Sequence, residues 1–182
     1  MEPIKTIYII DSSALINLRT INPIDIYKTP WERLGELIAC GRLITHSQVK
    51  DEITEGDDFL VDWIKEQDRE YDWVYSITEY QNKLLPEIQD TYPYFIKPEN
   101  EHDADPFVVA LALEKINIPP LQSTFETFEI KTEYVILSNE KSAKNRNLEN
   151  PYEVVKIPDF CALKNISCVQ LFGLFRRERW EF

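Results

Sequence analysis

The chain has little glycine, cysteine and histidine, and these shortages exclude several common sites. Its 182 residues include only 4 glycines, and neither GxGxxG nor GxxxxGK[ST] occurs, so the main signatures of dinucleotide-binding and P-loop proteins are missing. The cysteines (Cys40, Cys161, Cys168) and the histidines (His46, His102) lack the spacing of a zinc site. We therefore expect small, mostly buried thiols in a reducing compartment.

Long apolar runs are also missing. No stretch approaches the ~20 apolar residues that cross a bilayer, and the opening MEPIKT is too briefly apolar for a signal peptide. We expect a cytoplasmic protein without a membrane partner. An apolar fraction of 43% over 182 residues predicts one folded domain spanning residues 1–182.

The net charge of −12 is unusual for a protein that binds nucleic acid. The acidic excess lies in residues 1–140, whereas residues 141–182 carry a basic excess in EKSAKNR and at Arg176, Arg177 and Arg179. Such a basic run is usually a solvated face. The acidic part would repel a polyanion unless bound cations neutralise some of its charge.

Apolar strands alternate with helical patterns along the chain. TIYII (6–10) and EYVILS (133–138) are typical of strands buried on both faces, and helices are predicted at 47–53 and 105–116. This alternation predicts an α/β fold with a central, mainly parallel sheet between helical layers. Because functional sites in such sheets lie beyond the carboxyl ends of the strands, Asp11, Asn139 and Glu140 are expected at the same edge.

Two further acids are directed towards the sheet by helical periodicity. In the helix 47–53, Glu52 borders the buried face that Val49 and Ile53 define, whereas Asp51 faces water. Asp105 shares a face with the apolar residues of the helix 105–116. Each acid also has an ordinary explanation: Asp105 as a helix cap, Asp11 in a turn with its serines, and Glu52 and Glu140 as solvated residues.

Four carboxylates at one place repel one another, so either some are protonated or a cation lies among them. Oxygen ligands without Cys or His favour Mg²⁺ or Mn²⁺. Such an ion can activate a water molecule and neutralise a phosphate oxygen. A phosphatase with Asp11 as nucleophile is disfavoured because Ser13 stands where a second acid is usual, and a receiver domain lacks its acidic pair.

Four segments resemble, in order, the acidic motifs of PIN-domain nucleases, which include VapC-type toxins: YIIDSSALINL, VKDEI, DADPFVVALA and VILSNEK. WERLGELIACGRLITHSQVKDEI and KIPDFC further resemble a little-characterised PIN branch. The resemblance implies a three-layer α/β/α PIN-like fold and metal-dependent cleavage of phosphodiester bonds, usually in RNA. It also implies that the chain is the toxin of a toxin–antitoxin pair, with an antitoxin as partner and a homodimer as a common assembly.

By this resemblance Asp11, Glu52, Asp105 and Glu140 are the catalytic acids. Asp11 and Asp105 would bind Mg²⁺ or Mn²⁺ most directly, and Glu52 would complete the metal site or position the water. Ser13 and Asn139 would support them. The departure is Glu140, where many relatives carry Asp, so Glu140 could reach the ion through water.

Asp159 is an alternative fourth acid, although its place in KIPDFC favours the start of a helix. The glutamate at the fourth position and the negative charge also leave open a catalytically inactive PIN-like module that binds RNA or a protein.

Overall fold

The centre of the molecule is a five-stranded sheet. The computed structural model describes residues 4–54, 59–93, 95, 103–118, 131–143 and 155–182. Within these ranges the strands are arranged in the order β3-β2-β1-β4-β5, and every pairing is parallel. The strands are β1 (Ile4–Ile10), β2 (Leu43–His46), β3 (Val74–Tyr75), β4 (Lys131–Leu137) and β5 (Ser167–Val169). The predicted parallel sheet is therefore confirmed.

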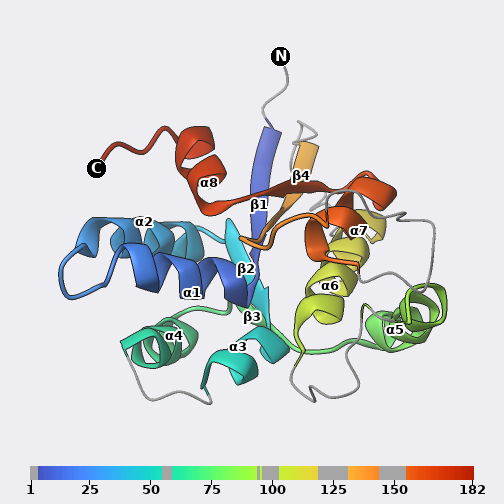
Figure 1. The fold of residues 1–182 in the computed structure, drawn as a ribbon. Helices are drawn as coiled ribbons and strands as arrows, with labels where there is room; N and C mark the ends of the chain where they lie inside the picture. The colour runs from blue at the N-terminus through green and yellow to red at the C-terminus, as the bar shows by residue number, and fades with distance from the viewer. Residues whose placement is uncertain (1–3, 55–58, 94, 96–102, 119–130, 144–154) are drawn as a thin grey trace, which may run out of the picture.

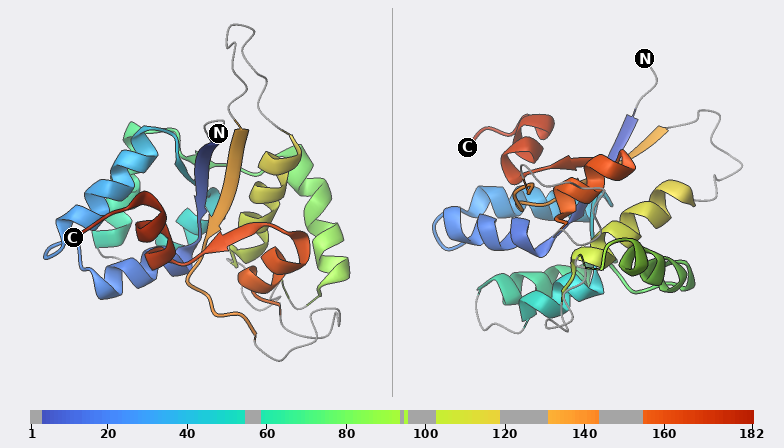
Figure 2. Two further views of the ribbon diagram at one scale, coloured as in Figure 1. Left: turned by 90° about the horizontal axis from the view of Figure 1, so that it is seen from above. Right: turned by 45° about the vertical axis from the view of Figure 1, so that its right-hand side comes forward.

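Helices cover both faces of the sheet, which gives the three predicted layers. Figures 1 and 2 show α1 and α2 on one side of β1 and β4, with α8 beside them, and α5, α6 and α7 on the other side. The helices are α1 (Ser12–Ile21), α2 (Lys28–Ala39), α3 (Ser47–Thr54), α4 (Phe59–Glu70), α5 (Glu79–Thr91), α6 (Asp105–Asn117), α7 (Ile157–Lys164) and α8 (Leu171–Glu178).

The core lies around the carboxyl-terminal halves of the two central strands. Ile9 and Ile10 of β1 and Val135 to Leu137 of β4 have no exposed surface, because helices pack on both faces of the sheet there. In α6, Val108 to Ala112 are equally buried. Because these segments are buried on all sides, their sequences are continuous apolar runs, as is usual for parallel strands and the helices that cover them.

Helix α3 confirms the periodicity argument. Val49 and Ile53 are buried, Asp51 is exposed and Glu52 is half-buried. Two edge strands were not anticipated, because β3 has two residues and β5 three, which is too short for an alternating pattern to be recognised.

The strand order reverses between β1 and β4. From β1 the chain proceeds outward to β2 and β3, whereas β4 and β5 extend the sheet on the other side of β1. The carboxyl ends of β1 and β4 therefore border a topological switch point, where open α/β sheets bind their ligands. The residues that follow these two strands are Asp11 and Ser138.

Candidate active site

Asp11 is fully buried at the end of β1. It is the N-cap of α1, and its side chain accepts a hydrogen bond from the Ser13 backbone nitrogen, so the turn interpretation of this residue holds. Its Oδ2 also accepts hydrogen bonds from the hydroxyls of Ser13 at 2.5 Å and Ser138 at 3.1 Å. Burial raises the pKa of Asp11, the Ser13 hydrogen bond opposes that rise, and the charge of Glu140 adds to it.

The same two hydroxyls join the loops after β1 and β4. Ser13 Oγ accepts a hydrogen bond from the Asn139 backbone nitrogen at 3.0 Å, and Ser138 Oγ accepts one from the Glu140 backbone nitrogen at 3.2 Å. Each hydroxyl thus accepts a hydrogen bond from the backbone of the loop after β4 and donates a hydrogen bond to Asp11. Sequence reasoning identified Ser13 but missed Ser138, although its place directly after an apolar strand was an available signal.

Asp105 begins α6 and is 9% exposed. The N-cap of this helix is Ala104, without a side-chain capping bond, so capping does not explain the aspartate. The Asp105 backbone nitrogen donates to Asp103 Oδ1 at 3.4 Å. Burial, followed by the negative charges of Asp11, Glu140 and Asp103, raises the pKa of Asp105 to about 8, and Lys156 opposes this rise.

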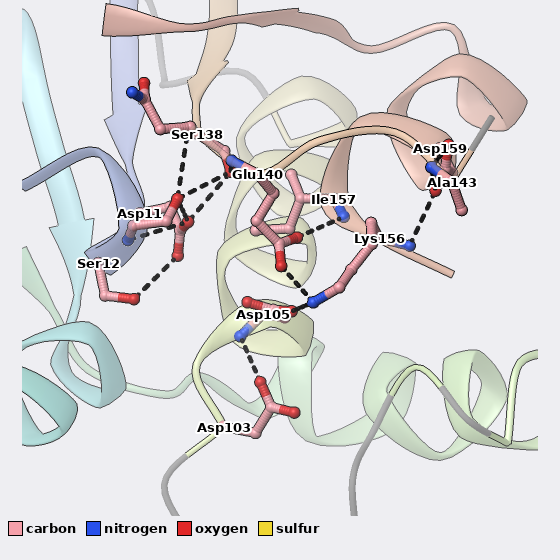
Figure 3. Close-up of polar contacts among 12 residues, drawn as sticks. Asp11, Ser12, Asp103, Asp105, Ser138, Glu140, Ala143, Lys156, Ile157 and Asp159 are labelled. Carbon is pink, nitrogen blue, oxygen red and sulfur yellow. Dashed lines mark hydrogen bonds and ion pairs between the residues drawn. The ribbon is translucent and has the colours of Figure 1, made fainter. Parts of the chain in front are cut away.

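Glu140 is held at the start of α7 rather than left in solvent. Its Oε2 accepts a hydrogen bond from the Ile157 backbone nitrogen at 3.0 Å, and its Oε1 forms an ion pair with Lys156 Nζ. That ammonium nitrogen also lies 3.9 Å from Asp105 Oδ2. Figure 3 shows the Lys156 side chain directed between the two acids. No sequence pattern marked Lys156, which joins the site only through the fold.

The remaining predicted residues have different surroundings. The Asn139 amide donates to Asn17 Oδ1 at 2.7 Å and accepts from the Leu171 backbone nitrogen at 2.8 Å, so it joins α1 to α8 rather than pointing at the acids. Glu52 lies on α3, which directly follows β2 and therefore starts at the same sheet edge. Topology, rather than a measured contact with Asp11 or Asp105, associates Glu52 with this edge.

Asp159 has the helix-start role that its sequence position favoured. Its carboxylate accepts hydrogen bonds from the backbone nitrogens of Lys156 and Ala143 and from the hydroxyl of Ser142. These contacts satisfy the beginning of α7 and fix the preceding loop beside it. Both oxygens of Asp159 thereby have a structural role at the start of α7.

Asp11, Asp105 and Glu140 come from three separate elements and form what we call the acidic cluster. Besides burial, the charge of Glu140 raises the pKa of Asp11, and the charges of Asp11 and Glu140 raise the pKa of Asp105. The pKa of Lys156 is raised, because the hydrogen bond and charge of Glu140 outweigh the opposing effect of burial. The cluster is thus a set of crowded, largely buried carboxyl groups with one ammonium beside them.

The donor chemistry of the acidic cluster fits a hard divalent cation. All donors are carboxylate oxygens, the ligands that Mg²⁺ and Mn²⁺ prefer. The pKa of Asp105 is raised by burial first and then by the neighbouring acids, and a bound cation would oppose both effects. In the described part of the chain, no three Asp, Glu, His or Cys side chains already have the spacing of a metal site. The present spacing is that of acids arranged around Lys156.

A cleft of about 720 Å³ adjoins the acidic cluster. It shares Ser138 and Glu140 with that site, and Lys141 contributes a positive charge to its lining. The cleft is large enough for a small ligand or one nucleotide. Its other walls come from α7, β5 and the residues next to them: Pro158, Cys161, Ala162, Ile166, Cys168, Val169 and Gln170.

Two comparisons with known proteins gave matches. Over the described residues, no helix has the length and apolar character needed to cross a membrane. The chain is similar in structure to the T. brucei RRP44 PIN domain, with a TM-score of 0.46, 11% sequence identity, and coverage of 94% of this chain and 79% of that one. No curated protein matches the sequence. A family model described as a domain of unknown function, DUF4411, matches residues 8–118, and the chain belongs to that family.

Proposed function

We propose that this protein is a divalent-metal-dependent nuclease of PIN type that hydrolyses phosphodiester bonds in RNA. The observation that carries the proposal is the convergence of Asp11, Asp105 and Glu140 at the switch point of the sheet, where the charge of Glu140 adds to the burial that raises the pKa values of Asp11 and Asp105. A bound Mg²⁺ or Mn²⁺ would supply an activated water and charge neutralisation at the phosphate. The PIN-like order of the four sequence motifs supports the same conclusion.

The residues of the acidic cluster would have different roles in binding the metal ion, according to their positions. Asp11 and Asp105 would hold the metal ion directly, since both are buried carboxylates at the cluster. Glu140 would contribute from the β4 loop, and Glu52 would complete the site or position the attacking water from α3. The hydroxyls of Ser13 and Ser138 orient Asp11, because both donate to its Oδ2.

The rest of the chain must accommodate a polyanion despite the net charge of −12. Helix α8 carries Arg176 and Arg177 in its last turn. Both are exposed; Arg177 is paired with Glu133 at 3.4 Å, and Arg176 donates to the Phe172 carbonyl of its own helix. These cations would contact the phosphate backbone, which positions RNA without reading its sequence.

The resemblance to VapC-type toxins extends the proposal to the role of the protein in the cell. The chain would act as the toxin of a toxin–antitoxin pair in the cytoplasm, an antitoxin would block it, and it would form a homodimer. Co-expression with the product of the neighbouring gene, followed by co-purification and a growth assay, tests this part separately from the chemistry.

The test of the chemistry is RNA cleavage in Mn²⁺ by the wild type, Asp11→Asn and Asp105→Asn. We expect cleavage to be lost in both variants, while the melting temperature in chelator is unchanged or higher because charge repulsion is relieved. Asp51→Asn is the matched control, since it removes one exposed carboxylate from α3. Cleavage that persists in both variants would show that the site is misplaced. A wild type that neither cleaves RNA nor binds Mn²⁺ would favour the inactive binding module instead.

A further inference from the structure

The lysine beside the acidic cluster is fixed by its own helix. Lys156 is the N-cap residue of α7. Its backbone nitrogen donates to Asp159 Oδ2 at 3.2 Å, and its carbonyl accepts from the Phe160 nitrogen at 2.9 Å. These bonds hold the backbone, so the side chain projects from a defined point. About a quarter of that side chain is exposed (27%), with the ammonium group turned inward.

The Lys156 ammonium engages two of the three acids that would bind the metal. It pairs with Glu140 Oε1 and lies 3.9 Å from Asp105 Oδ2. The other oxygen of Glu140 accepts from the Ile157 backbone nitrogen. Both oxygens of Glu140 therefore already have a partner at the start of α7, and a metal ion that binds Glu140 must come close to the Lys156 ammonium.

A divalent metal ion and the Lys156 ammonium exclude one another at these acids, because both are positively charged. A divalent ion held by Asp105 and Glu140 would lie within about 4 Å of an ammonium still paired with the same oxygens, and like charges so close in a partly buried site repel strongly. Conversely, when no metal is present, removal of the ammonium would leave the three carboxylates without a cation. Charge repulsion therefore favours one positive partner at a time beside these oxygens.

We propose that Lys156 is the resident cation of the acidic cluster, which stabilises the metal-free protein and must be displaced when a divalent ion binds. The inference rests on the proposed function, because it concerns the same metal site. It assigns Lys156 a regulatory role: the lysine lowers the affinity for the metal, so the nuclease is assembled only above a threshold metal concentration.

The experiment compares Lys156→Met with Lys141→Met. Methionine keeps most of the aliphatic stem of lysine and removes its charge. Lys141 is an exposed residue next to Glu140, so both variants change the net charge equally at nearly the same place. Titration calorimetry with Mn²⁺ alone should show about tenfold or tighter binding in Lys156→Met and an affinity within about twofold of the wild type in Lys141→Met.

Thermal melting in chelator provides a second readout that does not require activity. Lys156→Met should melt several degrees below Lys141→Met in chelator and should recover that loss in Mn²⁺. If Lys156→Met is unfolded in chelator, recovery of its circular dichroism spectrum on addition of Mn²⁺ supports the proposal, and failure to recover contradicts it.

The outcomes separate this inference from the proposed function. Equal Mn²⁺ affinities in the two variants, or weaker binding in Lys156→Met, overturn the role of Lys156 while leaving a metal-dependent nuclease in place. Absence of Mn²⁺ binding in the wild type and in both variants overturns the metal site and this inference together.

Discussion

Ser13 and Ser138 bring their hydroxyl oxygens within 3.2 Å of one another, and both donate to the same oxygen of Asp11. They lie 125 residues apart in the chain, so this small network joins the two central strands at the switch point of the sheet. A buried carboxylate without such donors would carry its full cost of desolvation. The hydrogen bonds from the two serines therefore oppose the rise that burial causes in the pKa of Asp11.

The Ser138 hydroxyl should contribute measurably to stability. Ser138→Ala removes a donor to a buried carboxylate and an acceptor for the Glu140 nitrogen, so we expect the free energy of unfolding to fall by roughly 1–3 kcal/mol in urea melts at neutral pH. Ser12→Ala is the control, because its hydroxyl is 3.4 Å from Asp11 Oδ1, and its loss should be smaller. Equal losses in the two variants would contradict a special role for Ser138.

The stability of the metal-free protein should depend on the ionisation of Asp105. Its pKa is raised from 3.8 to about 8 in the folded state, so between these values the folded state keeps a proton that the unfolded state has released. Stability contributed by this group is thus present at acid pH and is lost as the pH rises towards 8.

Urea unfolding in chelator at several values between pH 5 and pH 8.5 measures this dependence. In Asp105→Asn the free energy of unfolding should fall less as the pH rises, and at pH 8 it should exceed that of the wild type by roughly 2–5 kcal/mol. The exposed control Asp51→Asn should show the same dependence of the free energy of unfolding on pH as the wild type. A wild-type stability that rises with pH over this range, with no difference in Asp105→Asn, would contradict the proton on Asp105.

Glu52 and Asp51 are adjacent acids on α3, the first half-buried and the second exposed, and they make a paired test of Glu52 as a site residue. If Glu52 belongs to the metal site, Glu52→Gln should lower the rate of RNA cleavage in Mn²⁺ by about tenfold to a hundredfold, whereas Asp51→Asn should stay within about twofold of the wild type, since its side chain is exposed. The rates are compared at saturating Mn²⁺. Equal rates in the two variants would remove Glu52 from the site.

Glu178 connects α8 to the sheet. Its carboxylate accepts hydrogen bonds from the Tyr8 hydroxyl at 2.6 Å and from the Arg42 guanidinium at 2.6 and 2.8 Å. Glu178→Gln should lower the free energy of unfolding by roughly 1–3 kcal/mol, because the partly buried Arg42 loses its counter-charge. The same change at the exposed Glu181 should have little effect in the same melts.

Local patterns in the sequence predicted much of this arrangement. Apolar runs identified β1 and β4, and helical spacing assigned Glu52 to the margin of the buried face and Asp51 to solvent. Because parallel strands share one carboxyl edge, the fold class alone brought Asp11 and Glu140 to the same place. These inferences succeed because strand and helix periodicities are imposed by the backbone and are repeated over several residues.

Only the tertiary structure decided the partners of those acids. Ser138 contacts Asp11 across the sheet. Lys156 contacts Glu140 and Asp105 from the start of α7. Neither contact produces a periodic pattern in the sequence from which it could be predicted. The sequence by itself determined the sheet edge where the negative charges gather. Which cation lies among them depends on how α7 docks beside α6, because an electrostatic contact is set by distance in space and not by separation along the chain.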